Sequence, residues 1–227
     1  MNIKGLWRKI RQRILIKHSP EHYHEWHYDG GVWTRTFWMG IRTEKLPLDT
    51  WNYQEILFEL KPSLVVEFGT RFGGSALYFA SIMRSVGRPF RILSVDIDHD
   101  QTSPRTKADP DIELFTWSSA DSAVTDKIAQ MREHFPGPVF AILDSDHSQK
   151  HVLGEMMVIR PVLTPGDYVI VEDSNVNGHP VLPFFGPGPY EAIEEYFRQF
   201  PNDYKHDLER ESKFGLTWAP NGYLIRN

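Results

Sequence analysis

Acidic side chains cluster at two places in the sequence, each directly after a short apolar run. Asp144 and Asp146 form one pair, and Glu172 and Asp173 form the other. If the two runs are neighbouring strands, the four carboxylates meet and repel one another unless a cation lies among them. Oxygen ligands favour a hard ion such as Mg²⁺, Mn²⁺ or Ca²⁺ over zinc. The pattern therefore predicts a metal site, with helix capping as the alternative role for Asp146 and Asp173.

A histidine accompanies the first acidic pair, because His147 stands three residues after Asp144. An imidazole titrates near neutral pH and can remove a proton from a hydroxyl group. A cation held by the acids could bind that hydroxyl, lower its pKa and align it with a donor group. We therefore predict His147 and Asp144 as the catalytic residues of a group transfer to a hydroxyl.

A glycine-containing turn lies between an apolar run and a helical pattern in residues 64–83. It contains Glu67, Gly69, Gly73 and Gly74. The glycines let the backbone approach a ligand, and the free N–H groups of the helix start favour an anion. The spacing differs from the G-x-G-x-x-G pattern of dinucleotide sites. It fits a ligand with an amino acid and an adenosine, whose ammonium Glu67 could orient through water; close packing is the alternative role of Gly73 and Gly74.

A second nucleotide signal follows at the end of the next apolar run. Asp96 stands where a carboxylate can bind two ribose hydroxyls, and Asp98 is a second candidate. Together with the glycine turn, these acids predict a nucleoside-like ligand at the strand ends.

The elements that must position these residues alternate along the chain. Helical patterns cover 51–60, 121–134, 151–161 and 189–200, and strand patterns cover 64–68, 91–95, 112–117, 139–143 and 166–171. Such alternation predicts an α/β fold, a mostly parallel sheet with helices on both faces. Residues 204–210 and 222–226 predict a C-terminal antiparallel hairpin. The loop 174–189, rich in proline and glycine, is expected to be a substrate lid.

Residues 18–49 are rich in aromatic side chains, and we expect an irregular cap or arm over the domain. We divide the chain into an N-terminal part, 1–49, which includes this arm and the residues before it, and a main domain, 50–227. His27-Tyr28-Asp29 has the His-x-Asp spacing of an iron site, with surface or capping histidines as the alternative.

Composition narrows the function classes. The chain of 227 residues has a net charge of −5 and no cysteine, which excludes disulfides and cysteine metal sites and fits a cytoplasmic protein. Its acidic body argues against nucleic-acid binding. Residues 1–17 are basic and amphipathic, so they are either a docking helix or a peripheral contact with the inner membrane face. The aromatic arm favours a homo-oligomer.

Several stretches resemble class I S-adenosylmethionine-dependent methyltransferases and, more narrowly, the cephalosporin hydroxylase and rhamnosyl O-methyltransferase family. The matching stretches are KLPLDTWNYQEILFELKPSLVVEFGTRFGGSALYFA, SVDID, ILDSDHSQKHVLGEM, GDYVIVEDSNVNGHPV and FGLTWAPNGYLIR. The resemblance implies a Rossmann-like class I methyltransferase fold. It also implies a Mg²⁺-dependent O-methyltransferase that acts on a hydroxyl of a sugar, glycolipid or glycosylated natural product.

The resemblance also implies roles for particular residues. The donor, S-adenosylmethionine, would be held by the turn from Glu67 to Ser75, including Thr70. Its ribose would contact Asp96, and its adenine would lie near Ser118, Ser119 and Asp121. The Mg²⁺ ion would be held by Glu172 and Asp173 with one acid of the first pair. Related catechol-type enzymes favour Asp144 for that acid, whereas the closer family favours Asp146.

Two alternatives from other classes stay open. One is an NAD(P)-dependent oxidoreductase or an oxygenase on a related fold, which would bind a nicotinamide cofactor or redox iron. The other is a non-catalytic binding protein that retains the pocket.

Overall fold

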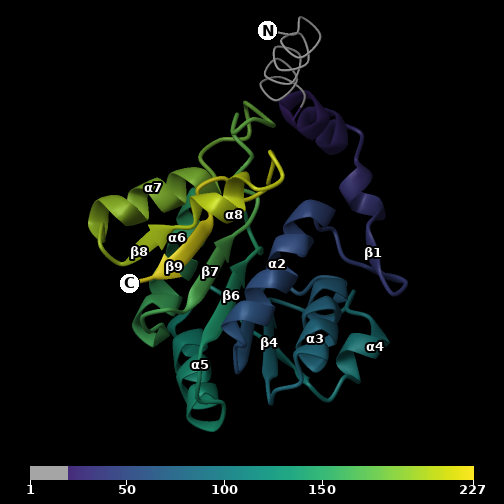
Figure 1. Cartoon of the computed structure of the whole chain (residues 1–227), viewed down its shortest axis with the longest axis vertical. Helices are drawn as coiled ribbons and strands as arrows, with labels where there is room; N and C mark the ends of the chain where they lie inside the picture. The colour runs from purple at the N-terminus through teal and green to yellow at the C-terminus, as the bar shows by residue number, and fades with distance from the viewer. Residues whose placement is uncertain (1–19) are drawn as a thin grey trace, which may run out of the picture.

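The computed structural model describes residues 20–227, and a seven-stranded sheet forms its centre (Figure 1). The strand order is β5-β4-β3-β6-β7-β9-β8. The first five strands in this order run parallel, and the last two are antiparallel to their neighbours. The strands are β3 (Leu64–Phe68), β4 (Arg91–Asp96), β5 (Ile112–Thr116), β6 (Val139–Leu143), β7 (Tyr168–Val171), β8 (Tyr204–His206) and β9 (Tyr223–Arg226).

Helices pack on both faces of this sheet. One face carries α2 (Pro47–Leu60) and α3 (Gly74–Val86); the other carries α5 (Ser122–His134), α6 (Gln149–Ile159) and α7 (Pro189–Gln199). Successive side chains of β3 point to opposite faces, so Val65 packs in one core cluster and Val66 in the other. The fully apolar strands β6 and β7 are buried on both sides, as parallel strands require.

The topology fixes the place of a ligand. The chain runs from β3 outward to β4 and β5, and then returns to lay β6 on the other side of β3. This reversal makes a switch point between β3 and β6, and ligands of open α/β sheets bind outside the carboxyl ends of the strands there. The glycine turn follows β3 and the first acidic pair follows β6, so both signals lie at this point.

The predicted fold class is confirmed, with four local corrections. The C-terminal strands pair as expected, but the first ends at His206, because Asp207 caps the short helix α8 (Leu208–Ser212). The helix α2 begins at Pro47, not at residue 51, since proline suits the first helical position. The short helix α4 (Pro104–Lys107) was not predicted.

The fourth correction concerns the aromatic arm, which is more regular than expected. Residues 20–29 are helical, and a 3-10 turn η1 (Val32–Arg35) and a small sheet of β1 (Phe37–Trp38) and β2 (Ile41–Arg42) follow. A second 3-10 turn, η2 (Arg160–Val162), follows α6. The predicted basic helix 1–17 lies outside the described residues. Within residues 20–227, every helix is too short or too polar to cross a bilayer.

Candidate active site

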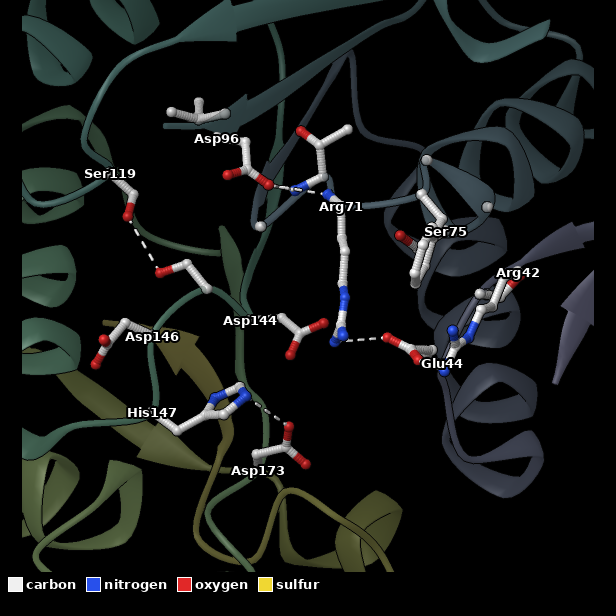
Figure 2. A pocket seen from close by; sticks show the side chains of 18 of the residues that line it. Arg42, Glu44, Arg71, Ser75, Asp96, Ser119, Asp144, Asp146, His147 and Asp173 are labelled. Atoms are coloured by element: carbon white, nitrogen blue, oxygen red, sulfur yellow. Dashed lines mark hydrogen bonds and ion pairs between the residues drawn. The ribbon is translucent and has the colours of Figure 1, made fainter. Parts of the chain in front are cut away.

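A cavity of about 590 Å³ lies at the carboxyl ends of the parallel strands (Figure 2). Its lining comes from the glycine turn after β3, the end of β4, the acidic segments after β6 and β7, and the aromatic arm. Segments from the whole length of the described chain therefore meet at one place.

The glycine turn has a conformation that other residues would strain. Gly69 has a φ of 93°, and a Cβ atom there would lie 2.0 Å from the carbonyl oxygen of Asp144. Gly73 has a φ of 78° and stands at the start of α3. Gly74 packs against the arm and not against the sheet, because an added Cβ would lie 2.3 Å from the carbonyl oxygen of Arg42. The tight turn is thus present, but the close packing expected between helix and sheet is instead packing of Gly74 against the arm and of Gly73 against Thr106 of the next helix.

Asp96 binds the glycine turn directly. Its Oδ2 atom accepts hydrogen bonds from the backbone N–H groups of Thr70 and Arg71, both at 2.9 Å, and its Oδ1 accepts one from Ile97. Figure 2 shows this carboxylate beside the turn at the edge of the cavity. Asp96 therefore orders the turn and still presents its carboxylate to a ligand. The second candidate, Asp98, caps a backbone N–H of Asp100 and lies outside the cavity lining.

Glu67 lies below the turn and outside the cavity lining, fully buried. Its Oε2 accepts a hydrogen bond of 2.5 Å from Ser94, whose hydroxyl lies 2.6 Å from that of Thr70. Burial raises the pKa of Glu67 to about 7. Its Oε1 has no hydrogen-bond partner among residues 20–227. Glu67 is thus linked to Thr70 through the hydroxyl of Ser94. Its contact with a ligand ammonium stays a prediction.

The arm closes the cavity above the turn. Glu44 pairs with Arg71 at 2.7 Å, and Figure 2 shows the two side chains meeting across the opening. Arg42 lies over the ring of Phe72, 4.7 Å from its centroid. The residues just before α2 are therefore part of the site, so the arm contributes more than a cover.

The acidic segments bring three metal-ligating side chains together. Ligand atoms of Asp144, His147 and Asp173 lie within 4.8 Å of one another. His147 Nε2 lies 3.2 Å from Asp173 Oδ2. Burial alone would lower the pKa of His147, but Asp173 and Asp144 outweigh it and raise the pKa above its usual value. Burial raises the pKa of Asp173, against the opposing effect of His147.

The other two predicted metal ligands lie differently. Asp146 lines the cavity, but its carboxylate accepts a hydrogen bond of 2.8 Å from the backbone N–H of Ser148 and points away from Asp144 (Figure 2). Glu172 is buried and lies outside the cavity lining. The geometry therefore favours Asp144 and Asp173 as the acids available to a cation, whereas Asp146 binds the backbone N–H of Ser148, the N-cap residue of α6, and is not itself the helix cap.

A lysine that the sequence reasoning did not select completes the acidic region. The Lys45 ammonium forms ion pairs with Asp144 and with Glu172, the latter at 2.5 Å. The other oxygen of Glu172 accepts a hydrogen bond of 2.5 Å from the Tyr53 hydroxyl. Both oxygens of Glu172 therefore have protein partners. The available signal was the resemblance itself, since its first matching stretch begins at Lys45.

A polar cluster lies near the end of β5, where an adenine ring was expected. Ser119 is buried and lies 2.9 Å from His151 Nε2, and its hydroxyl donates to Glu155 at 2.6 Å. Ser118 is exposed and lies outside the lining, and Asp121 caps α5 by accepting from Ala123. Of the three residues predicted for this end, the structure brings Ser119 alone into the cavity lining.

Aromatic side chains form the wall next to the acids. Tyr28 and Trp33 come from the arm, and Trp218 comes from the segment before β9. The ring of Tyr28 lies 6.2 Å from that of Trp33 and 5.9 Å from that of Trp218. His27 packs edge-on against Trp218, which gives it a structural role. Among residues 20–227, His27 and Asp29 belong to no group that could hold a metal.

Comparisons with known proteins give matches over most of the chain. A family model described as rhamnosyl O-methyltransferase/CmcI matches residues 30–227. A rhamnosyl O-methyltransferase of Mycobacterium tuberculosis (strain ATCC 25618 / H37Rv) is 61% identical over 207 residues, which are 91% of this chain and 84% of that protein. A rhamnosyl O-methyltransferase of Mycobacterium leprae (strain TN) is 58% identical over 206 residues, which are 91% of this chain and 90% of that protein.

Solved structures share the fold. An apo structure of CmcI is 22% identical with a TM-score of 0.69, over 85% of this chain and 76% of that one. A structure of CmcI with Mg and SAM is also 22% identical, with a TM-score of 0.65 over 86% of this chain and 77% of that one. These similarities establish the architecture of a class I methyltransferase.

Proposed function

Because the chain belongs to the rhamnosyl O-methyltransferase/CmcI family, we propose that it transfers a methyl group from S-adenosylmethionine to a sugar hydroxyl in a Mg²⁺-dependent reaction. The acceptor oxygen forms a bond to the methyl carbon, the bond from that carbon to sulfur breaks, and the hydroxyl proton passes to the protein. The products are a sugar methyl ether and S-adenosylhomocysteine.

One observation carries this proposal. Asp144, His147 and Asp173 converge within a few ångströms of one another in the same cavity that the glycine turn lines. A donor site and a proton acceptor must adjoin for methyl transfer, because the reacting atoms need contact distance and alignment.

The donor side of the cavity offers groups suited to a nucleoside. Asp96 can accept a hydrogen bond from a ribose hydroxyl at Oδ1, since this oxygen accepts only the Ile97 N–H whereas Oδ2 already accepts two backbone N–H groups. Thr70 and Ser75 line the cavity beside it and can bind the amino acid part. Ser119 can contact the adenine ring at the far end.

The acids suit a hard divalent cation. Asp144 and Asp173 supply carboxylate oxygens at one place, and Mg²⁺ is commonly held by one or two carboxylates with water and substrate oxygens. Bound there, the ion would hold the acceptor oxygen and lower the pKa of its hydroxyl. The protein's own part is to keep the two carboxylates at the ends of adjacent strands.

His147 is the proposed general base. Its Nε2 lies 3.2 Å from the Asp173 carboxylate, so a proton taken from the acceptor by the other ring nitrogen, Nδ1, gives an imidazolium that this carboxylate stabilises. Asp173 also orients the ring, which keeps the base directed at one position in the cavity.

The acceptor is expected against the wall made of Tyr28, Trp33 and Trp218. Sugar rings present C–H faces that pack on aromatic rings, and the wall adjoins the acids. A rhamnosyl group is the first acceptor to test, because both mycobacterial relatives bear that name.

Calorimetric titration of S-adenosylmethionine and Mg²⁺ tests the proposal. We expect the parent to bind both, and Asp173→Ala to bind Mg²⁺ at least tenfold more weakly because a carboxylate ligand is lost. Asp98→Ala serves as the matched control, since this exposed acid lies outside the cavity lining. Binding of NAD(P) in place of S-adenosylmethionine would instead favour the oxidoreductase alternative.

A methylation assay with a rhamnosyl acceptor, followed by mass spectrometry, tests the reaction itself. Donor binding without any product from a panel of sugar acceptors would favour a non-catalytic binding protein.

Membrane contact through residues 1–17 and self-association stay predictions. Liposome flotation with and without residues 1–17 tests the first, and sedimentation tests the second.

A further inference from the structure

Lys45 occupies an unusual position for a lysine. It stands two residues before the first residue of α2, and its side chain is 3% exposed. Its ammonium lies between Asp144 at the end of β6 and Glu172 at the end of β7. Lysine is almost never fully buried unless it is paired. The ammonium is therefore held there by the two carboxylates.

The charges around this lysine explain why its ammonium is stable in a buried position. Asp144, Glu172 and Asp173 bring three acids to two adjacent strand ends, and all three are poorly solvated. Burial would lower the pKa of Lys45, but Asp144 and then Glu172 outweigh it and raise the pKa. For the carboxyl group of Glu172 the effects are reversed: burial raises its pKa to about 7, and the charge of Lys45 opposes that rise. Without the ammonium, Asp144 and Glu172 would lose the cation that they directly contact.

The same carboxylate is needed by the proposed metal. Asp144 belongs to the group that could hold a divalent ion and is also a direct partner of Lys45. Two cations that share one carboxylate repel each other, so each weakens the binding of the other. This coupling is reciprocal, because it is a difference in free energy between the same states.

We propose that Lys45 is an internal counter-ion that competes with the divalent cation for Asp144. In the absence of metal, its charge stabilises the folded arrangement of the acids, and in the presence of metal it lowers the affinity of the site for the ion. This inference rests on the proposed function, since it concerns the same Mg²⁺ site. Glu172 is the second partner of the lysine, since its Oε2 accepts from Lys45 while its Oε1 accepts from Tyr53.

Lys45→Met tests the proposal, since methionine keeps an unbranched apolar chain and removes the charge. Lys107→Met is the matched control, because Lys107 is exposed in α4, away from the cavity lining. Calorimetry with Mg²⁺ alone is the readout, without donor or acceptor. We expect Lys45→Met to bind Mg²⁺ at least tenfold more tightly than the parent, and Lys107→Met to match the parent.

Thermal unfolding gives a second readout. Without metal, Lys45→Met should lose on the order of 10 °C in Tm, because a buried acid pair is left uncompensated. Saturating Mg²⁺ should restore most of that loss, and should raise the Tm of the parent less. The double variant Lys45→Met/Glu172→Gln removes one charge of each sign, so its metal-free Tm should return toward that of the parent.

Distinct results overturn distinct claims. Equal or weaker Mg²⁺ binding by Lys45→Met, beside clear binding by the parent, would overturn the competition and leave the proposed function standing. No Mg²⁺ binding by either protein would remove the metal from the proposed function and this inference with it. A double variant as unstable as Lys45→Met would mean that lost packing, and not charge, causes the instability.

Discussion

The donor side and the acidic side of the cavity are built on different physical principles. On the donor side, Asp96 accepts backbone hydrogen bonds from Thr70 and Arg71, so its charge is satisfied by the turn that it orders. On the acidic side, the charges of Asp144 and Glu172 are balanced by one lysine from a distant segment. The first arrangement is local and made of backbone, whereas the second is long-range and made of charged side chains.

This difference predicts how each side responds to its ligand. A backbone turn fixed by glycines and one aspartate is largely preformed, so donor binding should need little rearrangement. Carboxylates that already hold an ammonium must redistribute their contacts when a divalent ion arrives. We therefore expect the two sides to be separable by mutation, with donor affinity and catalysis failing independently.

The largest expected effect comes from His147→Ala. Loss of the proposed base should lower kcat by roughly 10²–10⁴-fold, the usual contribution of general acid–base catalysis. Affinity for S-adenosylmethionine should stay near the parent value, because His147 belongs to the acidic side. Single-turnover kinetics and calorimetry measure the two quantities, with His134→Ala on the exposed end of α5 as control. A parallel fall in donor affinity would contradict the separation.

Gly69 joins the two sides, and its replacement should be the next largest effect. An alanine Cβ would lie 2.0 Å from the carbonyl oxygen of Asp144 at a φ of 93°. We expect Gly69→Ala to cost on the order of 3 kcal/mol of unfolding free energy through clash and backbone strain. Gly87→Ala is the control, because Gly87 has a φ of 74° with open space around it, and should cost only about 1 kcal/mol. Urea unfolding measures both, and similar costs would show that the contact with Asp144 yields easily.

The donor side could be predicted from the sequence more completely than the acidic side. The glycine turn and Asp96 lie on consecutive elements, and a parallel sheet brings them together by rule. Lys45 is 99 residues from Asp144 and 127 from Glu172, and no local pattern links it to them. A lysine before a helix is ordinarily an exposed residue, so only the folded structure identifies its partners.

The choice between Asp144 and Asp146 illustrates a second limit. Both are acids after the same strand, and the sequence gives them equal chemistry. The local backbone decides which side chain points inward, and here it directs Asp146 to cap the N–H of Ser148. Residues 20–29 belong to the segment 18–49, which was expected to be irregular, yet they form a helix that buries His24 and His27 at a helical spacing of three. That spacing was the signal available.

The third expected effect is spread over several pH units and concerns Asp49, a buried acid that anchors α2 beside the acidic side. Its carboxylate accepts hydrogen bonds from Thr217 Oγ1 at 2.6 Å, from the Trp218 backbone at 2.8 Å and from the Tyr223 hydroxyl at 2.8 Å. Burial nevertheless raises its pKa from 3.8 to about 7. Because the folded pKa exceeds the unfolded one, the folded state binds more protons between about pH 4 and pH 7, and stability falls as pH rises through that window.

Asp49→Asn should remove this dependence while leaving the contributions of other acids in place. The unfolding free energy of the parent should therefore fall with pH more steeply than that of the variant, by up to roughly 1.4 kcal/mol per pH unit between pH 4 and pH 7. Urea titrations at pH 5, 6, 7 and 8, with the exposed Asp126→Asn as control, measure the two slopes. Parallel curves for parent and Asp49→Asn would mean that the three hydrogen bonds keep Asp49 ionised throughout. The contrast would then lie between hydrogen-bonded and lysine-paired acids, and no longer between two sides of the cavity.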